Sequence, residues 1–185
     1  MAQSTTDQKA FTELVAIAAR SLKYASGLPA QVDITPHWSG VGYKLMGHRF
    51  VAPLGEVIES IEVPAFTRIP GVQPWIKGVA NVRGRLLPIM DLGGFFNQSI
   101  TGTRKERRVL IIEFGEIYSG LMVEEVYGMQ HFPVDTFSKS VPDFGNGIRP
   151  YLKGSYIQGG VQWVVFSPYT MANSEKFFQA EAVGT

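Results

Sequence analysis

Apolar residues near the start of the chain recur with the period of an α-helix. One face of such a helix would carry Phe11, Leu14, Val15, Ala18 and Leu22. Thr5, Thr6 and Asp7 are suitable capping residues just before this run. We therefore expect a helix over residues 6–24, either packed on its own domain or exposed as a docking helix. Gly27 and Pro29 break the pattern, so residues 25–37 are expected to form a linker.

Beyond residue 38 the pattern changes to short β-type runs separated by glycine-containing turns. The turn residues are Gly47-His48, Arg83-Gly84, Gly115-Glu116 and Gly159-Gly160. Four short hairpins without helical crossovers favour an all-β sandwich or barrel over βαβ units. A type II′ turn is expected at Gly47-His48, because glycine adopts positive φ without steric cost.

Part of the β pattern is repeated. Trp75-Ile76-Lys77-Gly78 returns as Tyr151-Leu152-Lys153-Gly154, 76 positions downstream. The first and third hairpins are each followed by Glu-Val, at Glu56-Val57 and Glu125-Val126. This similarity predicts a duplicated unit of about five strands, a number that suits small closed barrels.

The last part of the chain is expected to be irregular and then helical. Residues 129–150 are rich in proline and glycine and are expected to form a loop whose phenylalanines are buried on the barrel or on a partner. The tail from Pro168 is expected to contain a helix and then to fray.

Composition narrows the classes of function. The chain has 185 residues, a formal net charge of +1 and no cysteine. Disulfides and thiolate metal sites are thus excluded, and nucleic-acid binding is disfavoured because phosphate binding normally needs a large positive excess. No signal peptide or membrane-spanning run is expected.

The candidate catalytic groups form no recognisable constellation. His37, His48 and His131 lack the short spacing of a metal site. Glu124 and Glu125 should point to opposite faces of a strand, and Asp91 is better placed as a helix cap than as a catalytic acid. We therefore expect no catalytic residues, no metal and no cofactor; a hydrolase using Asp91, Glu124 or His131 is a minor alternative.

The Arg83 turn is a candidate binding feature. Lys77, Val79, Asn81 and Arg83 share one strand parity, whereas the other parity is small and apolar, as in a barrel interior. Asn81 is placed to bond the turn backbone and hold Arg83 out as a fixed planar fork for a carboxylate or carbonyls on another protein. The alternative is a solvated turn arginine without a role.

These residues carry a family resemblance. The segments Phe66–Pro70, Trp75–Gly84 and Pro88–Leu92 resemble the CheW-type coupling proteins of bacterial chemosensory arrays, with weaker similarity at Gly120–Val126 and Tyr151–Gly154. The resemblance covers about residues 38–167. It implies a mainly β fold of two SH3-like five-stranded barrels, here with an N-terminal helix and a short C-terminal helix, and it implies no enzyme activity.

The resemblance also implies partners. Family members bind the helical cytoplasmic tip of a chemoreceptor and the regulatory domain of a CheA-like histidine kinase. Matched by motif, the receptor surface would include Arg83, with Asn81 and Gly84 shaping its loop, and Leu54, Val57 and Glu59 from the preceding strand. The kinase surface is expected on the second barrel. Such a protein would be cytoplasmic and recruited to membrane-associated arrays.

Some features depart from the general pattern. The N-terminal helix is long, residues 35–40 are an unusual entry, and the last strand lacks an acidic residue. These features resemble the PilI-like adaptors of type IV pilus twitching-motility systems. The expected organisation is an N-terminal extension (1–37), a double-barrel domain (38–168) and a helical tail (169–185). An oligonucleotide-binding barrel, with Trp38, Trp75 and Trp163 stacking bases, remains the alternative function.

Overall fold

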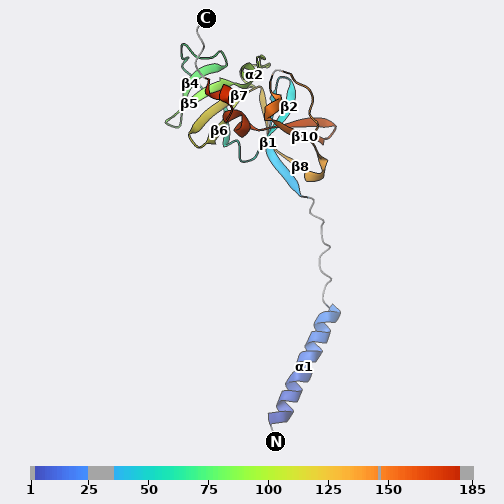
Figure 1. Cartoon of the computed structure of the whole chain (residues 1–185). Coiled ribbons are helices and arrows are strands. Elements are labelled where there is room, and N and C mark those ends of the chain that lie inside the picture. Colours follow the sequence, from blue (N-terminus) through green and yellow to red (C-terminus); the bar gives the residue numbers. More distant parts are fainter. Residues whose placement is uncertain (1–2, 25–35, 146, 180–185) are drawn as a thin grey trace. The chain divides into compact units, whose positions relative to one another are not determined.

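The structure is a computed structural model that describes residues 3–24, 36–145 and 147–179 (Figure 1). It divides into two units at Ile34 and Thr35, and each unit is described by itself. The first contains helix α1 (Gln3–Tyr24), which begins three residues before the expected start. Its apolar residues Phe11, Leu14 and Val15 are exposed. Most of the expected linker, residues 25–35, lies outside the described residues, and His37 already belongs to a strand.

The second unit consists of two curled sheets. The six-stranded sheet has the order β8-β1-β2-β11-β10-β9, and the five-stranded sheet has the order β3-β6-β7-β5-β4. We call them barrel A and barrel B. The strands of barrel A are β1 (His37–Leu45), β2 (His48–Pro53), β8 (Glu125–Pro133), β9 (Phe137–Ser138), β10 (Leu152–Gln158) and β11 (Val161–Phe166). Those of barrel B are β3 (Glu59–Glu62), β4 (Ile76–Val82), β5 (Arg85–Asp91), β6 (Arg108–Phe114) and β7 (Ile117–Val123).

Each barrel combines strands from both copies of the sequence repeat. Strands β1, β2, β3, β4 and β5 correspond in order to β6, β7, β8, β10 and β11, and this correspondence converts one sheet order into the other. The hairpin β1–β2 therefore lies in barrel A with the last strands of the second copy, whereas β6–β7 lies in barrel B with the last strands of the first. The predicted duplication is confirmed, but its hairpins are exchanged between the barrels.

The repeated Lys-Gly motif marks the same irregularity in both barrels. The register between β4 and β5 shifts between Ile76 and Gly78, and that between β10 and β11 shifts between Leu152 and Gly154. Both glycines have positive φ, 146° and 153°. A Cβ at Gly78 would collide with the carbonyl of Thr67, and one at Gly154 with the carbonyl of Ser138. Glycine is required here because a neighbouring backbone lies too close for a side chain.

The core is shared by the barrels. The larger cluster joins buried residues of barrel B, such as Leu87 and Val109, with Tyr43, Phe50 and Phe166 of barrel A. A smaller, aromatic-rich cluster fills the other face of the six-stranded sheet and contains Val51, Phe132, Tyr156, Trp163 and Val165. The two barrels therefore bury a continuous apolar layer, which favours their folding as one body.

Three local expectations for barrel A differ from the structure. Residues 129–133 are not a loop but the second half of β8, in which Phe132 is fully buried. The first hairpin turn is formed by Met46 and Gly47, not Gly47 and His48, and both have positive φ, as a type I′ turn requires. Barrel A also has a sixth strand, the two-residue β9, where five strands were expected.

Short helices follow β5, β8, β9 and β11. Helix α2 (Leu92–Phe95) comes directly after β5, and the 3₁₀ turns η1 (Val134–Thr136) and η2 (Arg149–Tyr151) precede β9 and β10. The tail forms α3 (Pro168–Ala172) and α4 (Glu175–Phe178) instead of one helix. Met171 and Phe177 are buried in the larger core cluster. The expected domain boundaries stay a prediction.

Candidate protein-binding site

The Arg83 turn is held in a strained conformation by its neighbours. Arg83 and Gly84 have φ of 53° and 80°, and the first value is unfavourable for a residue with a Cβ. The Gly84 N–H donates to Asn81 Oδ1 at 2.9 Å, which is the predicted bond from Asn81 to the turn backbone. The turn therefore fixes the position from which the Arg83 side chain leaves the sheet.

Arg83 and Glu59 are brought together by the curl of barrel B. Glu59 begins the edge strand β3, and Arg83 lies in the turn next to the opposite edge strand, β4. The Arg83 Nη2 donates to Glu59 Oε1 at 2.6 Å. The Arg83 side chain nevertheless remains 75% exposed. The guanidinium was expected to face a carboxylate of another protein; it is paired within the chain and still accessible from outside.

The other residues predicted for this surface lie in the segment between β2 and β3. Leu54 is 45% exposed, whereas Val57 is partly buried and packs against the core. Ile58, which the sequence analysis did not select, is 58% exposed beside Glu59. The segment thus presents two apolar side chains outward, while Val57 supports it from below.

A second arginine site next to Arg83 was also missed. Arg85 donates through both terminal nitrogens to Glu113, at 2.8 and 3.2 Å. Its guanidinium carbon lies 3.8 Å from the centre of the Tyr118 ring. The sequence held a signal for this site, because Arg85 has the parity of the buried Leu87 and Ile89. A charged residue on the interior parity at the end of a strand is typical of a barrel opening.

The residues of the hydrolase alternative have separate structural contacts. Asp91 caps α2, since its Oδ1 accepts from the Gly94 N–H, and it pairs with Lys77 at 3.2 Å. His131 Nδ1 lies 2.7 Å from Ser39 Oγ at an exposed site. Glu124 is buried and accepts from the Gly47 and Thr101 N–H groups. Among the described residues no cluster of three or more His, Asp or Glu side chains is arranged to hold a metal.

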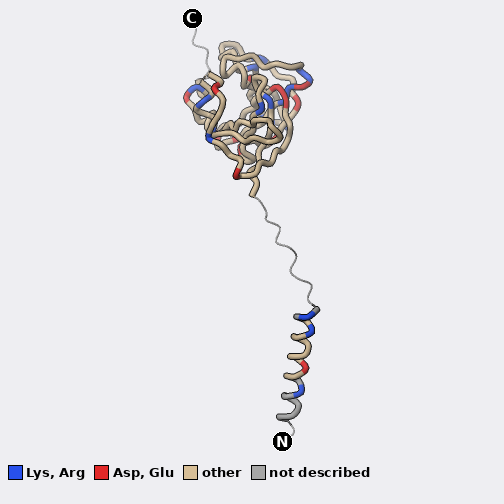
Figure 2. The backbone as a smooth tube through the Cα atoms, turned by 90° about the vertical axis from the view of Figure 1, so that its right-hand side faces the viewer, with Lys and Arg blue, Asp and Glu red and all other residues tan. Residues whose placement is uncertain are grey.

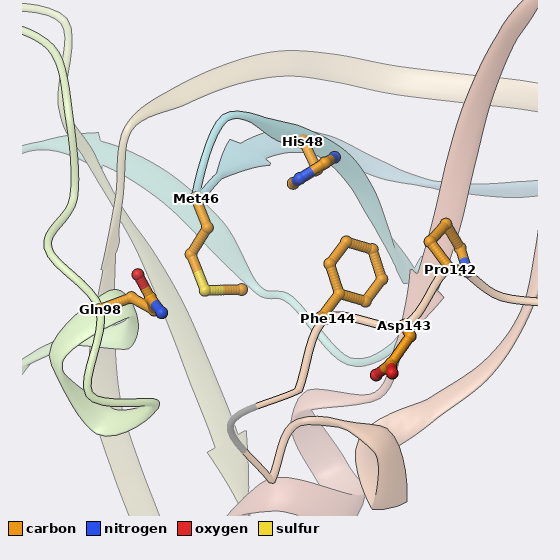
Figure 3. A pocket seen from close by; sticks show the side chains of 6 residues that line it. All are labelled: Met46, His48, Gln98, Pro142, Asp143 and Phe144. Carbon is orange, nitrogen blue, oxygen red and sulfur yellow. The ribbon is translucent and has the colours of Figure 1, made fainter.

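A cavity of about 230 Å³ lies where the β1–β2 hairpin approaches two loops of the second unit (Figure 3). It is lined by Met46 and His48 from the hairpin and by Gln98, Pro142, Asp143 and Phe144 from the loops. The His48 and Phe144 rings pack edge to face with centres 5.0 Å apart. Asp143 Oδ1 accepts a hydrogen bond from the Gly145 N–H, so this carboxylate stabilises its own loop. None of the predicted site residues lines this cavity.

Charges of both signs are interspersed along the second unit (Figure 2). Its densest basic run, Arg104–Arg108, lies in the loop before β6 and ends at the first residue of that strand, Arg108. Arg107 and Arg108 donate to backbone carbonyls of this loop or its flank, including those of Ile100 and Lys105. The side chains of these two arginines therefore stabilise the loop through hydrogen bonds to its backbone. No described helix is long and apolar enough to cross a bilayer.

Comparison with known proteins agrees with the fold. A family model described as "CheW-like domain" matches residues 39–176. The protein PilI of Pseudomonas aeruginosa is 48% identical over 170 residues, which cover 92% of this chain and 95% of PilI. The chemotaxis protein CheW of Bacillus subtilis is 41% identical over 59 residues, covering 32% of this chain and 38% of that protein.

A solved structure shows the same fold. The scaffolding protein TtCheW from Thermoanaerobacter tengcongensis superposes with a TM-score of 0.65 at 19% identity, covering 76% of this chain and 96% of that chain. Two curled sheets with an arginine turn at one rim define a double-barrel β module. The chain belongs to the CheW-like domain family, and it is similar to PilI over most of its length.

Proposed function

We propose that this chain is a non-catalytic adaptor that couples the helical tip of a chemoreceptor to a CheA-like histidine kinase. Relatives named PilI and CheW support a signalling adaptor of the chemotaxis or pilus-motility type, and the long match to PilI favours the twitching-motility branch. The oligonucleotide-binding alternative is not favoured, since Trp75 and Trp163 are buried and not available to stack on bases.

The observation that carries the proposal is the exposed Arg83 turn, paired with Glu59, on a CheW-like fold. The segment that leads to Glu59 adds the exposed side chains of Leu54 and Ile58. Exposed apolar side chains bordered by a charge pair match the anatomy of protein interfaces, in which an apolar centre is surrounded by a polar rim. A helical hairpin laid on this surface would contact Leu54 and pair with the outer side of Arg83. The kinase would bind elsewhere, and the adaptor would be recruited to arrays from the cytoplasm.

Charge reversal at Arg83 tests the receptor surface. Arg83→Glu places two carboxylates together and removes the exposed cation, so we expect the purified chain to lose capture of a receptor tip fragment by at least about tenfold. Binding of the kinase regulatory domain and the circular dichroism spectrum should remain unchanged. Arg104→Glu, at an exposed position of the basic loop, is the matched control for net charge.

A double variant in which Arg83 and Glu59 exchange their charges shows whether Arg83 contacts the receptor or only stabilises the fold. Arg83→Glu combined with Glu59→Arg restores an ion pair within the chain but inverts the charge that faces outward. If Arg83 contacts the receptor, binding stays weak in this double variant. Full recovery would mean that the pair only supports the fold, and normal binding by Arg83→Glu itself would show that the assigned surface is wrong.

A further inference from the structure

The open end of barrel B holds a small hollow of about 140 Å³. Ile58, Val82 and Ile111 supply its apolar part. Ile111 is buried, Val82 is partly buried and Ile58 is 58% exposed, so the apolar surface continues from the barrel interior to the outside. A hollow of this size accommodates one aliphatic side chain, not a whole metabolite.

The register explains why charged residues surround this hollow. Val82 pairs with Arg85, Glu59 with Ile111, and Glu113 with Tyr118 across neighbouring strands. These residues continue the interior parity of Ala80, Leu87 and Val109, which are buried deeper in the barrel. The barrel interior therefore ends in two ion pairs, Arg83–Glu59 and Arg85–Glu113, instead of an apolar plug.

The Arg85 side chain is fixed in position by two of its neighbours. Its two terminal nitrogens are forked onto Glu113, and one guanidinium face is stacked on Tyr118. The hydrogen bond from Arg85 lowers the pKa of Glu113, so the carboxylate keeps its charge, and the pair its attraction, to a lower pH. Little side-chain freedom remains to be lost when a partner binds, which is the general advantage of a preorganised guanidinium.

The surface presented outward is positive although the pairs are neutral. The side chains of Arg83 and Arg85 are 75% and 55% exposed, whereas those of Glu59 and Glu113 are 31% and 37% exposed. The carboxylates lie inward and the guanidinium groups outward. A partner approaching the hollow therefore meets cations first, around an exposed isoleucine.

We propose that this hollow takes an apolar side chain of a helical partner and that Arg85 binds a carboxylate about one helical turn away on the same partner. The inference rests on the proposed adaptor function and adds Ile58, Arg85, Glu113 and Tyr118 to its receptor surface. Ile58 contacts the apolar side chain, and Arg85 selects a tip that carries the acid at the matching position. Glu113 and Tyr118 are positioning residues for Arg85.

Barrel A provides a matched control. Arg49, on the strand equivalent to that of Tyr118, lies over the Tyr127 and Trp163 rings at 5.1 and 5.2 Å. It is an exposed arginine stacked on aromatic rings, as Arg85 is, but it belongs to the other barrel. Arg49→Ala therefore removes the same kind of interaction without touching the hollow.

The test is calorimetric titration of the full chain with the cytoplasmic helical hairpin of a methyl-accepting chemoreceptor from the same organism. We expect Arg85→Ala and Ile58→Asp each to weaken binding about tenfold, whereas Arg49→Ala binds as the unaltered chain does. Each acidic residue of the hairpin tip is then changed to its amide. For one of them the loss should be large with the unaltered chain and absent with Arg85→Ala.

The outcomes separate this inference from the proposed function. If the unaltered chain binds the hairpin and both Arg85→Ala and Ile58→Asp bind equally well, the inference is wrong and the adaptor function stands. If only Ile58→Asp weakens binding, the carboxylate contact is overturned. If the unaltered chain does not bind the hairpin at all, the receptor function fails, and the inference fails with it.

Discussion

At the scale of single residues, Glu124 has the most consequential contacts. It is 2% exposed, and its two carboxylate oxygens accept from the Thr101 N–H at 2.8 Å and the Gly47 N–H at 3.2 Å. Gly47 belongs to the β1–β2 hairpin of barrel A, whereas Thr101 follows the helix that comes after β5 of barrel B. One buried side chain therefore joins the β1–β2 turn of barrel A to the loop that follows β5 and α2 of barrel B, and its loss leaves backbone donors without a partner.

Glu124→Gln is expected to destabilise the chain at neutral pH. The two N–H groups face different carboxylate oxygens. In glutamine one of these oxygens is replaced by an N–H₂ group, so one backbone N–H would face another donor. Because buried charged hydrogen bonds contribute a few kcal/mol, we expect a loss of about 1–3 kcal/mol in the free energy of unfolding. Urea denaturation at pH 7 measures it. Glu116→Gln, at an exposed turn, should leave the free energy within about 0.5 kcal/mol.

The difference in unfolding free energy between the unaltered chain and Glu124→Gln should depend on pH in a defined direction. Burial raises the pKa of Glu124, but the hydrogen bonds from Thr101 and Gly47 outweigh it and bring the pKa below the ordinary 4.5. A carboxyl whose pKa is lower in the folded state contributes stability above its unfolded pKa and loses it as the pH falls through the folded pKa. The gap between the unaltered chain and Glu124→Gln should thus be constant above about pH 5 and shrink below it. A gap that widens with acid would contradict this assignment.

At the scale of elements, α3 is fastened to the segment that carries the candidate receptor residues. Glu56 accepts from Ser167 Oγ at 2.9 Å and from the Tyr169 N–H at 2.8 Å. Ser167 is also the N-cap of α3, since its Oγ accepts from the Thr170 N–H. A carboxylate near the exposed N–H groups of a helix start is favourable. The position of Val57 and Glu59 therefore depends partly on a helix far along the chain.

A double-mutant cycle on Glu56 and Ser167 is expected to show coupling. Each of Glu56→Gln and Ser167→Ala should lower the free energy of unfolding by about 1 kcal/mol, and the double variant should lose less than the sum, by at least about 0.5 kcal/mol. Hydrogen exchange should become faster at the Tyr169 and Thr170 amides in both single variants. Strict additivity with unchanged exchange would mean that the contact does not hold α3.

Features that depend on a few neighbouring residues were predictable from the sequence. The Asn81 bond to the Arg83 turn and the Asp91 cap of α2 each span three residues. The Glu59 and Arg85 contacts span 24 and 28 residues, and they exist only because the sheet curls back on itself. The family resemblance predicted Glu59 as a surface residue, but it did not predict the ion pair between Glu59 and Arg83. The second half of β8 was missed because its burial alternates poorly and Gly128, with φ of 75°, interrupts the strand beside a shift in register.

At the scale of the whole second unit, the exchanged hairpins tie the two barrels together. The parallel pairing of β2 with β11 in barrel A corresponds to that of β5 with β7 in barrel B, and in each case the two strands come from different repeats. Barrel A is made of two separate stretches of chain, β1–β2 and β8–β11, and barrel B is the stretch from β3 to β7 that lies between them. The larger core cluster contains residues of both barrels. The barrels should therefore unfold as one cooperative unit instead of as two domains in series.

Single-tryptophan variants report on each barrel separately. Keeping only Trp163, which is buried in barrel A, or only Trp75, which is buried directly before β4 of barrel B, and changing the other tryptophans to phenylalanine gives two fluorescence reporters. Their urea midpoints should coincide. Leu87→Ala, at a fully buried position of barrel B, should then lower the free energy of unfolding by about 2–5 kcal/mol. Because the core is continuous, this loss should appear equally in the Trp163 signal, although Trp163 lies in the other barrel. A shift confined to the Trp75 reporter would show that the barrels unfold independently, and the exchanged hairpins would then not couple them.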